Sequence, residues 1–89
     1  MREIRQTSQF RADLKRIAKS GRYRKEDLMD LLELLSEDEP IPIKYRDHAL
    51  SGEWNQFREC HIKPDWLLIY RLEPGVLLLA RTGSHSDLF

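Results

Sequence analysis

Histidine is the residue type in this chain whose chemistry is most informative, and all three copies lie in its second half, at His48, His61 and His85. An imidazole has an unperturbed pKa of about 6.5, so near neutral pH it both accepts and donates protons. Asp65 follows His61 by four residues, and a tight turn between two antiparallel strands would bring these two side chains together. His85 follows the last predicted strand, which ends beside the same turn. The spacing therefore predicts one cluster of three histidines and an aspartate.

Such a cluster suits cleavage of an RNA phosphodiester by attack of its own 2′-hydroxyl group. This reaction needs a base for the hydroxyl proton, an acid for the departing 5′-oxygen and positive charge beside the pentacovalent phosphorus. Histidines supply the proton transfers, and Arg81 is the candidate donor to the phosphoryl oxygens. Trp66 and Phe89 are candidates for stacking on an unpaired base.

Structural roles compete with each of these assignments. A single histidine at a strand end is more often a surface or hydrogen-bonding residue than a catalyst. Trp66 lies in a dense apolar run and is individually more typical of a core, and Arg81 has an ion pair with Asp65 as its alternative. Cys60 lies within a predicted strand, where it is interpreted as a small buried apolar residue.

A metal site is the alternative chemistry for the same residues. Nitrogen, oxygen and sulfur ligands are all available, from His61 and Asp65 together with His48, His85 or Cys60. The spacing matches no compact zinc pattern. The sequence therefore favours acid/base chemistry with no metal and no cofactor.

The first half of the chain is expected to form a short strand and two helices. Ile4 and Thr7 indicate the strand, Ser8 is the expected N-cap of the first helix, and Gly21 is its expected stop. Apolar residues at helical spacing predict a second helix from about Arg24 to Asp38. Because the connection is short, the two helices are expected to be antiparallel neighbours.

The second half is expected to form three strands. They are predicted at Trp54–Ile62, Asp65–Leu72 and Val76–Thr82, with a type II turn at Glu73–Gly75 and a short tail at Ser84–Phe89. The predicted fold class is α+β: an N-terminal strand, a helical hairpin and an antiparallel meander with the helices on one face. A chain of 89 residues is expected to form one domain, 1–89.

Composition excludes several classes of protein and reveals an uneven charge. The formal net charge is zero, but residues 1–25 carry nine Lys/Arg against two Asp/Glu, and residues 26–39 carry seven acids and no base. A single cysteine excludes an internal disulfide, and the charged start does not resemble a signal peptide. The longest apolar runs are five residues, so no membrane span is expected and the cytoplasm is the predicted location.

At the candidate residues the sequence resembles a known family, the YafQ-type toxins of the RelE/ParE superfamily, which are toxins of bacterial type II toxin–antitoxin pairs. The resemblance rests on the order H-x-L-x-G, H-I-x-P-D-W and R-T-G-S-H. In this chain the motifs stand at 48–52, 61–66 and 81–85, followed by Leu88 and Phe89.

The resemblance implies a RelE/ParE-like fold and a ribosome-dependent mRNA endonuclease that needs no metal. It implies that a cognate antitoxin inhibits the toxin, which would be a monomer alone and part of a hetero-oligomer with the antitoxin. It also implies contacts with mRNA and ribosomal RNA, and no membrane partner. The active-site residues that it implies are His48, His61, Asp65, His85 and Phe89, with Arg81 and Trp66 as supporting members.

Two other functions remain open from the sequence. One is a non-nuclease ParE-like toxin, in which the histidine cluster is not expected, and the other is a catalytically silent interaction module. Members of the superfamily are usually basic, whereas this chain is neutral because of residues 26–39. The basic residues 1–25 are therefore the predicted contact for RNA phosphates or for an acidic antitoxin segment.

Overall fold

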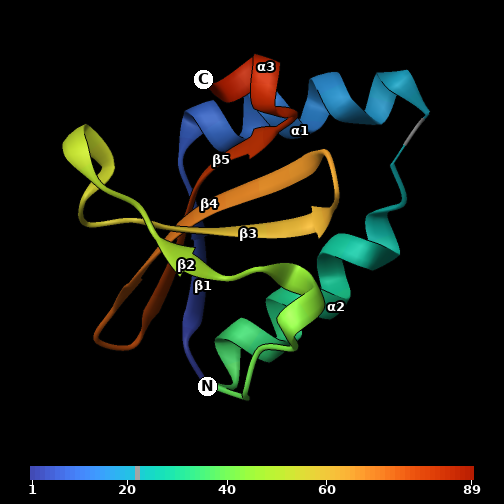
Figure 1. Cartoon of the computed structure of the whole chain (residues 1–89). Helices are drawn as coiled ribbons and strands as arrows, with labels where there is room; N and C mark the ends of the chain where they lie inside the picture. The colour runs from blue at the N-terminus through green and yellow to red at the C-terminus, as the bar shows by residue number, and fades with distance from the viewer. Residues whose placement is uncertain (22) are drawn as a thin grey trace.

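A computed structural model describes residues 1–21 and 23–89 of the chain. Its strands and helices follow one another in the order shown in Figure 1. They are β1 (Glu3–Gln6), α1 (Ser8–Ser20), α2 (Lys25–Ser36), β2 (His48–Ala49), β3 (Arg58–Lys63), β4 (Trp66–Glu73), β5 (Val76–Gly83) and α3 (His85–Leu88), with 3₁₀ turns at Ile43–Tyr45 and Gly52–Trp54.

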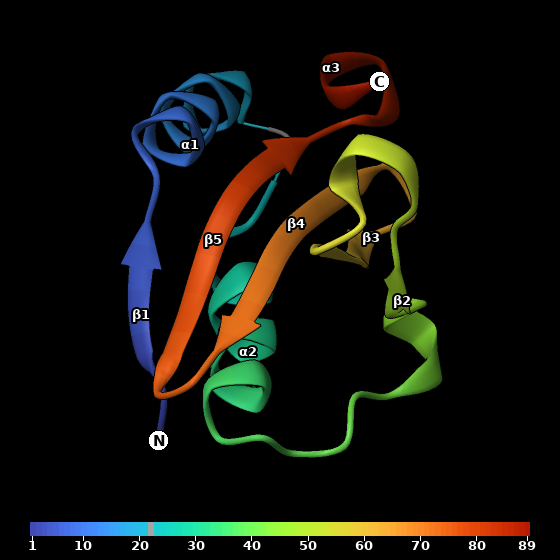
Figure 2. The same cartoon turned by 90° about the vertical axis from the view of Figure 1, so that its left-hand side faces the viewer.

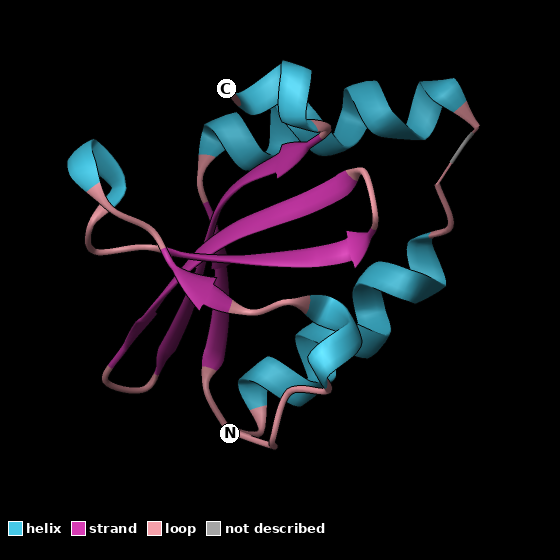
Figure 3. Ribbon diagram, viewed as in Figure 1, coloured by secondary structure: helices cyan, strands magenta, loops and turns pink. Residues whose placement is uncertain are grey.

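The strands form one five-stranded mixed sheet in the order β1-β5-β4-β3-β2 (Figure 3). β3, β4 and β5 are the antiparallel meander that the sequence predicts, and Gly75 in the β4–β5 turn has the positive φ of 70° that a type II turn requires. β1 pairs parallel to β5, and the two-residue β2 pairs antiparallel to β3. The α+β fold class is confirmed, while both edge pairings are additions that the sequence does not predict.

Both helices contribute to the same hydrophobic core, although they do not lie side by side. α1 contacts β5, and α2 contacts β3 and β5. Figure 2 shows α2 behind β4 and β5, with α1 near the upper end of β1 and β5, so the helices diverge instead of forming the expected antiparallel neighbours. Among the described residues, no helix has the length and apolar character needed to span a bilayer. The largest fully buried apolar side chains are Trp66, Tyr70, Phe10, Leu31, Leu67, Leu68, Ile69, Leu77 and Leu79.

The helix ends differ from the sequence prediction at two places. The N-cap of α1 is Thr7 and not Ser8: the Thr7 hydroxyl accepts a hydrogen bond from the Phe10 amide (3.0 Å) and donates one to the Ala80 carbonyl (2.9 Å). One side chain therefore caps α1 and ties it to β5. α2 ends at Ser36, before the predicted Asp38.

Two segments of the second half also differ from the prediction. The first strand of the meander was expected to begin at Trp54, but β3 begins at Arg58. Trp54 instead belongs to the 3₁₀ turn at residues 52–54. The predicted tail forms the short helix α3, whose start is stabilised by a capping box between Ser84 and Asp87. The helix matters because His85 is its first residue.

A buried carboxylate joins α1 to the end of β5. Asp13 is fully buried and accepts hydrogen bonds from Arg81 Nε (2.7 Å) and Nη2 (3.1 Å), from the Thr82 amide (3.2 Å) and from Arg16 Nη1 (3.1 Å). Burial raises the pKa of Asp13, but the hydrogen bonds from Arg81 and Thr82 outweigh burial and leave this pKa below its ordinary value. The group is therefore an ionised, fully partnered carboxylate in the folded protein.

The residues after this ion pair leave the sheet through Gly83, which is closely surrounded by side chains of α1 and α3. Gly83 has φ of 155°, and a Cβ there would lie 3.0 Å from Arg16 Nη2 and from Asp87 Oδ2. A larger residue at this position would therefore require the side chains of Arg16 and Asp87 to shift. Thr82 connects β5 to β4, since its hydroxyl accepts a hydrogen bond from Trp66 Nε1 (2.9 Å) and donates one to the Leu67 carbonyl (2.7 Å).

Replacing Asp13 by Asn tests this connection. We expect Asp13→Asn to lower the free energy of unfolding by about 3–5 kcal/mol, because Arg81 loses its buried counter-charge. Because the folded-state pKa is below the unfolded value of about 3.9, the carboxylate stabilises the fold fully above that pH and loses its effect as the pH falls. The difference between wild type and Asp13→Asn should therefore narrow below about pH 4.

Denaturant unfolding followed by circular dichroism at several pH values measures this difference. Glu33→Gln, which removes an exposed carboxylate from α2, is the matched control and should change stability by less than about 0.5 kcal/mol. A gap between wild type and Asp13→Asn that is constant from pH 7 to pH 3 would contradict the assignment.

Candidate active site

His48 lies at the outer edge of the sheet, where the backbone carbonyl of Arg46 fixes its ring. Its Nδ1 lies 2.7 Å from the carbonyl oxygen of Arg46, and because a carbonyl oxygen only accepts, Nδ1 must carry the proton. Nε2 of His48 lies 3.4 Å from Glu59 Oε1, and this contact is an ion pair only when Nε2 is protonated as well. Arg46 has a left-handed backbone (φ 48°, ψ 43°), and this turns its carbonyl toward the ring of His48.

Glu59 is the carboxylate between two of the histidines. It is opposite His48 in the β2–β3 register, and its Oε1 lies 3.3 Å from His61 Nε2. The Glu59 side chain is only 7% exposed and that of His61 12% exposed, so the ion pair that forms when His61 is protonated is largely shielded from water. A β-bulge follows His61 in β3 and breaks the regular pairing with β4 there.

His85 and Asp65 form the second histidine–carboxylate pair. Asp65 Oδ1 lies 3.0 Å from His85 Nδ1 and also accepts a hydrogen bond from the His85 amide (3.1 Å). Because the carboxylate is the acceptor, Nδ1 of His85 carries the proton, and the neutral ring has Nε2 free. The side chains are 57% and 59% exposed, so this pair is open to a substrate. Phe89, 63% exposed, lies one helical turn further along, where its amide donates to the His85 carbonyl.

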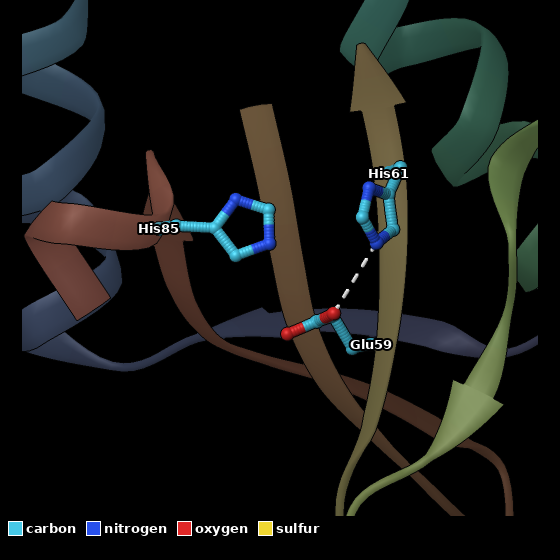
Figure 4. Close-up of side chains that lie close together, drawn as sticks. All are labelled: Glu59, His61 and His85. Atoms are coloured by element: carbon cyan, nitrogen blue, oxygen red, sulfur yellow. Dashed lines mark ion pairs between the residues drawn. The ribbon is translucent and has the colours of Figure 1, made fainter. Parts of the chain in front are cut away.

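The three imidazole rings line one rim of the sheet. The ring centroids of His48 and His61 are 6.2 Å apart, and those of His61 and His85 are 5.7 Å apart. In Figure 4, His61 on β3 and His85 at the start of α3 stand on either side of Glu59. The tertiary structure thus brings together His48, His61, Asp65 and His85, and Phe89 follows His85 by one helical turn.

Glu59 is the residue of this rim that sequence reasoning did not select. A strand over this segment was predicted, and side chains two residues apart in a strand point to the same face, so the position of His61 was itself a signal for Glu59. The contact with His48 had no such signal, because it depends on the pairing of β2 with β3. Asp65, which was expected beside His61, holds His85.

A second carboxylate, Asp47, anchors the segment that carries His48. It accepts hydrogen bonds from Tyr70 Oη (2.5 Å), Arg58 Nε (3.3 Å) and Nη2 (3.2 Å), and Cys60 Sγ (3.5 Å). Burial raises the pKa of Asp47, but the hydrogen bonds from Tyr70 and Arg58 outweigh burial and hold it below its ordinary value. Burial, followed by the charge of Asp47, raises the pKa of Cys60 to about 12, so this thiol is neutral near pH 7.

Trp66 and Arg81 lie behind the rim. Trp66 is 1% exposed, and its ring packs on that of Tyr23, with centroids 4.7 Å apart. Tyr23 Oη in turn donates to the Asp65 carbonyl (3.3 Å), so these two aromatic residues support the β3–β4 turn. Arg81 uses Nε and Nη2 to bind Asp13, which leaves Nη1 for any phosphate.

Three groups of the rim also have the arrangement of a metal site. Glu59, His61 and His85 each offer one ligand atom, and these atoms all lie within 4.8 Å of one another. Two imidazole nitrogens and a carboxylate oxygen are a donor set that suits copper or zinc. Cys60, which the sequence offers as a sulfur ligand, is buried at Asp47 instead.

The fold and this rim define a small α+β protein of the RelE type, in which histidines and carboxylates occupy one edge of a mixed sheet. Residues 2–89 match the family described as the bacterial toxin of type II toxin–antitoxin systems, YafQ. The chain belongs to this YafQ toxin family.

Individual relatives match over nearly the whole chain. The mRNA interferase toxin YafQ of Escherichia coli K12 is 38% identical over 89 residues, which are 99% of this chain and 96% of that protein. A copper-bound mutant toxin from Helicobacter pylori is 38% identical, with a TM-score of 0.95 and coverage of 100% of both chains. The toxin of the E. coli DinJ–YafQ toxin–antitoxin complex is 38% identical, with a TM-score of 0.86 and coverage of 99% of this chain and 97% of that chain.

Replacing Asp47 by Asn tests whether Asp47 positions His48. The amide cannot balance the charge of Arg58, so we expect a loss of about 1–3 kcal/mol of stability together with release of the His48 segment. In NMR spectra the Nδ1–H resonance of His48 should broaden or disappear, while that of His85 remains. Tyr70→Phe, which keeps the carboxylate and its pair with Arg58, is the control and should disturb His48 less. An unchanged His48 resonance in Asp47→Asn would refute the positioning role.

Proposed function

We propose that this chain is the toxin of a type II toxin–antitoxin pair and that it cleaves mRNA on the ribosome. The observation that carries the proposal is the pair of exposed imidazoles, His48 and His85. Each has its Nδ1 held by an oxygen acceptor, so Nε2 is the nitrogen left for proton exchange, and in His48 this nitrogen lies 3.4 Å from Glu59 Oε1. An imidazole fixed in one tautomer is ready for proton transfer at the other nitrogen. The E. coli relative named an mRNA interferase toxin supports the choice of RNA as substrate.

In the proposed reaction, the 2′-oxygen of the nucleotide attacks the adjacent phosphorus while one histidine Nε2 takes its proton. The bond from phosphorus to the 5′-oxygen breaks, and a second, protonated histidine donates its proton to that oxygen. The products are a 2′,3′-cyclic phosphate and a 5′-hydroxyl. His85 is assigned as the leading acid/base residue, with His48 or His61 as its counterpart. Asp65 and Glu59 stabilise the imidazolium forms of the rings that they contact.

The charge that develops on the phosphoryl oxygens needs cationic groups. A protonated histidine of the rim meets this need, and Nη1 of Arg81 is the further donor. Trp66 is assigned a supporting role under Asp65, because stacking on a base would require it to leave the core. Phe89 is exposed and is the proposed stacking residue.

The proposed partners are the ribosome with its mRNA, in the cytoplasm, and a cognate antitoxin. The exposed basic side chains of α1, among them Lys15 and Lys19, support contact with ribosomal RNA phosphates or an acidic antitoxin segment. The DinJ–YafQ complex of the E. coli relative supports an antitoxin partner.

Metal is not required in this proposal, but the rim fits one. When bound, a copper or zinc ion would act as a Lewis acid at Glu59, His61 and His85. Its bonds would occupy the imidazole lone pairs that the proton transfers use. The Helicobacter pylori toxin that is described as copper-bound supports metal binding by a protein of this fold. The ion is therefore expected to be an inhibitor here.

Cleavage of ribosome-bound mRNA by purified protein tests the acid/base assignment. We expect His85→Ala to lower the single-turnover rate roughly 10²–10⁴-fold, because one of the two proton transfers is lost. Wild type should leave a 2′,3′-cyclic phosphate, and naked mRNA should be cut far more slowly than mRNA on the ribosome. Gln56→Ala, on the loop before β3, is the control for a general effect of substitution.

Expression in growing cells separates the remaining functions. Growth arrest by wild type with intact transcripts would reject the nuclease and favour a ParE-like toxin. Absence of both arrest and cleavage would favour a silent interaction module. Cleavage by His85→Ala at the wild-type rate would reject the site assignment.

Metal dependence is tested in the same purified system. A chelator selective for copper and zinc, with Mg²⁺ kept sufficient for the ribosome, should leave the rate unchanged, whereas added Cu²⁺ should lower it. Calorimetry should show Cu²⁺ binding that His61→Gln weakens. A rate that falls with the chelator and recovers with the metal would overturn metal independence.

A further inference from the structure

A pocket beside the histidine rim extends the site toward α2. It has a volume of about 370 Å³ and lies between α2, the 3₁₀ turn Ile43–Tyr45 and the end of β3. His61 lines this pocket and also belongs to the rim. In Figure 4, His61 stands with His85 on one side and the ribbon of α2 on the other. The other lining residues are Asp27, Asp30, Lys44, Tyr45, Arg46, Ile62, Lys63 and Pro64.

Two cationic side chains of the pocket, Lys44 and Arg46, are available to bind an anionic group. Lys63 Nζ lies 3.4 Å from Asp27 Oδ2, a buried oxygen that has no well-oriented hydrogen bond, so these two charges neutralise each other. Lys44 and Arg46 are exposed, and within residues 1–21 and 23–89 neither has an ion pair. Lys44 Nζ instead lies over the Tyr45 ring, 5.1 Å from its centroid.

The position of these cations suits the RNA chain rather than a free anion. RNA that runs from a scissile phosphate at the rim past His61 enters this pocket, because His61 lines both the pocket and the rim. Lys and Arg are the side chains that bind backbone phosphates. Asp30, on the pocket wall, disfavours a bare anion but accepts N–H groups of a nucleobase.

We propose that this pocket binds the nucleotide next to the scissile phosphate, with Lys44 and Arg46 holding the phosphate of that nucleotide. The proposal rests on the proposed RNA cleavage and adds a subsite to it. Both side chains come from the segment that ends at His48, so the subsite and one acid/base residue have a common support. Binding there would draw the RNA across His61 and align the scissile bond.

Neutral linkages in the mRNA test the subsite directly. A set of ribosome-bound mRNAs, each with one methylphosphonate linkage near the cleavage position, removes one backbone charge at a time. With wild type, one linkage next to the scissile phosphate should lower the single-turnover rate at subsaturating toxin about tenfold, as expected for loss of a charge-assisted hydrogen bond. Lys44→Ala/Arg46→Ala should show a similar loss with natural mRNA and no further loss with that neutral linkage.

Arg5→Ala/Arg71→Ala is the matched control, because it removes two cations from other parts of the sheet, where each pairs with a carboxylate. It should keep the wild-type sensitivity to the neutral linkage. Melting temperatures of both double variants check their folding. The same mRNA set should give the same pattern for binding to the ribosome complex in a His85→Ala background, where cleavage is slow on the time scale of the binding measurement.

The outcomes separate the subsite from the function. Suppose that wild type cleaves and that the rate loss from the neutral linkage is the same in wild type and in Lys44→Ala/Arg46→Ala. The neutral phosphate and the two cations then act independently, which would reject the subsite. Equal cleavage of natural mRNA by wild type and this double variant would also reject it. If wild type cleaves no ribosome-bound mRNA, the proposed function itself fails.

Discussion

The ion pair between Asp13 and Arg81 is the interaction on which the position of the site depends. It joins the middle of α1 to the last residues of β5, and the same carboxylate also binds the Thr82 amide. From there the chain passes through Gly83, where a side chain would meet Arg16 and Asp87, and enters α3 at His85. A buried charge of this kind is stable only with all its partners in place. The orientation of α3 therefore depends on α1 as well as on the contacts of His85 with Asp65.

The rim is built from two halves that are anchored independently. His85 and Asp65 depend on the end of β5 and on the β3–β4 turn, which Tyr23 and Trp66 support. The other half depends on Asp47, whose bonds to Tyr70 and Arg58 fix the segment before His48. Glu59 is common to the two halves because it contacts His48 and lies beside His61, whose ring neighbours that of His85. Proton transfer at a fixed distance requires both anchors at once.

Much of the fold was predictable because its signals are local. The three meander strands and the turn at Gly75 follow from apolar runs and from one glycine with positive φ, and α1 ends at Gly21 for the same conformational reason. By residue type Ser8 is the better N-cap, whereas the structure uses Thr7. The Ala80 carbonyl of β5, which binds the Thr7 hydroxyl, favours Thr7.

The sequence alone determined which chemistry this protein can offer: imidazoles and carboxylates near strand ends, one buried thiol without a disulfide partner, and the motifs of a toxin family. Residue type and spacing of a few positions carry this information, because a strand alternates faces and a tight turn joins neighbours. The tertiary structure decided the partners. It paired Asp65 with His85, brought Glu59 between two histidines, and bound Arg81 to Asp13. These contacts join residues that are distant in the chain. The pairing of strands, the placement of the helices and the burial of side chains bring them within hydrogen-bonding distance, and the spacing of residues along the sequence does not.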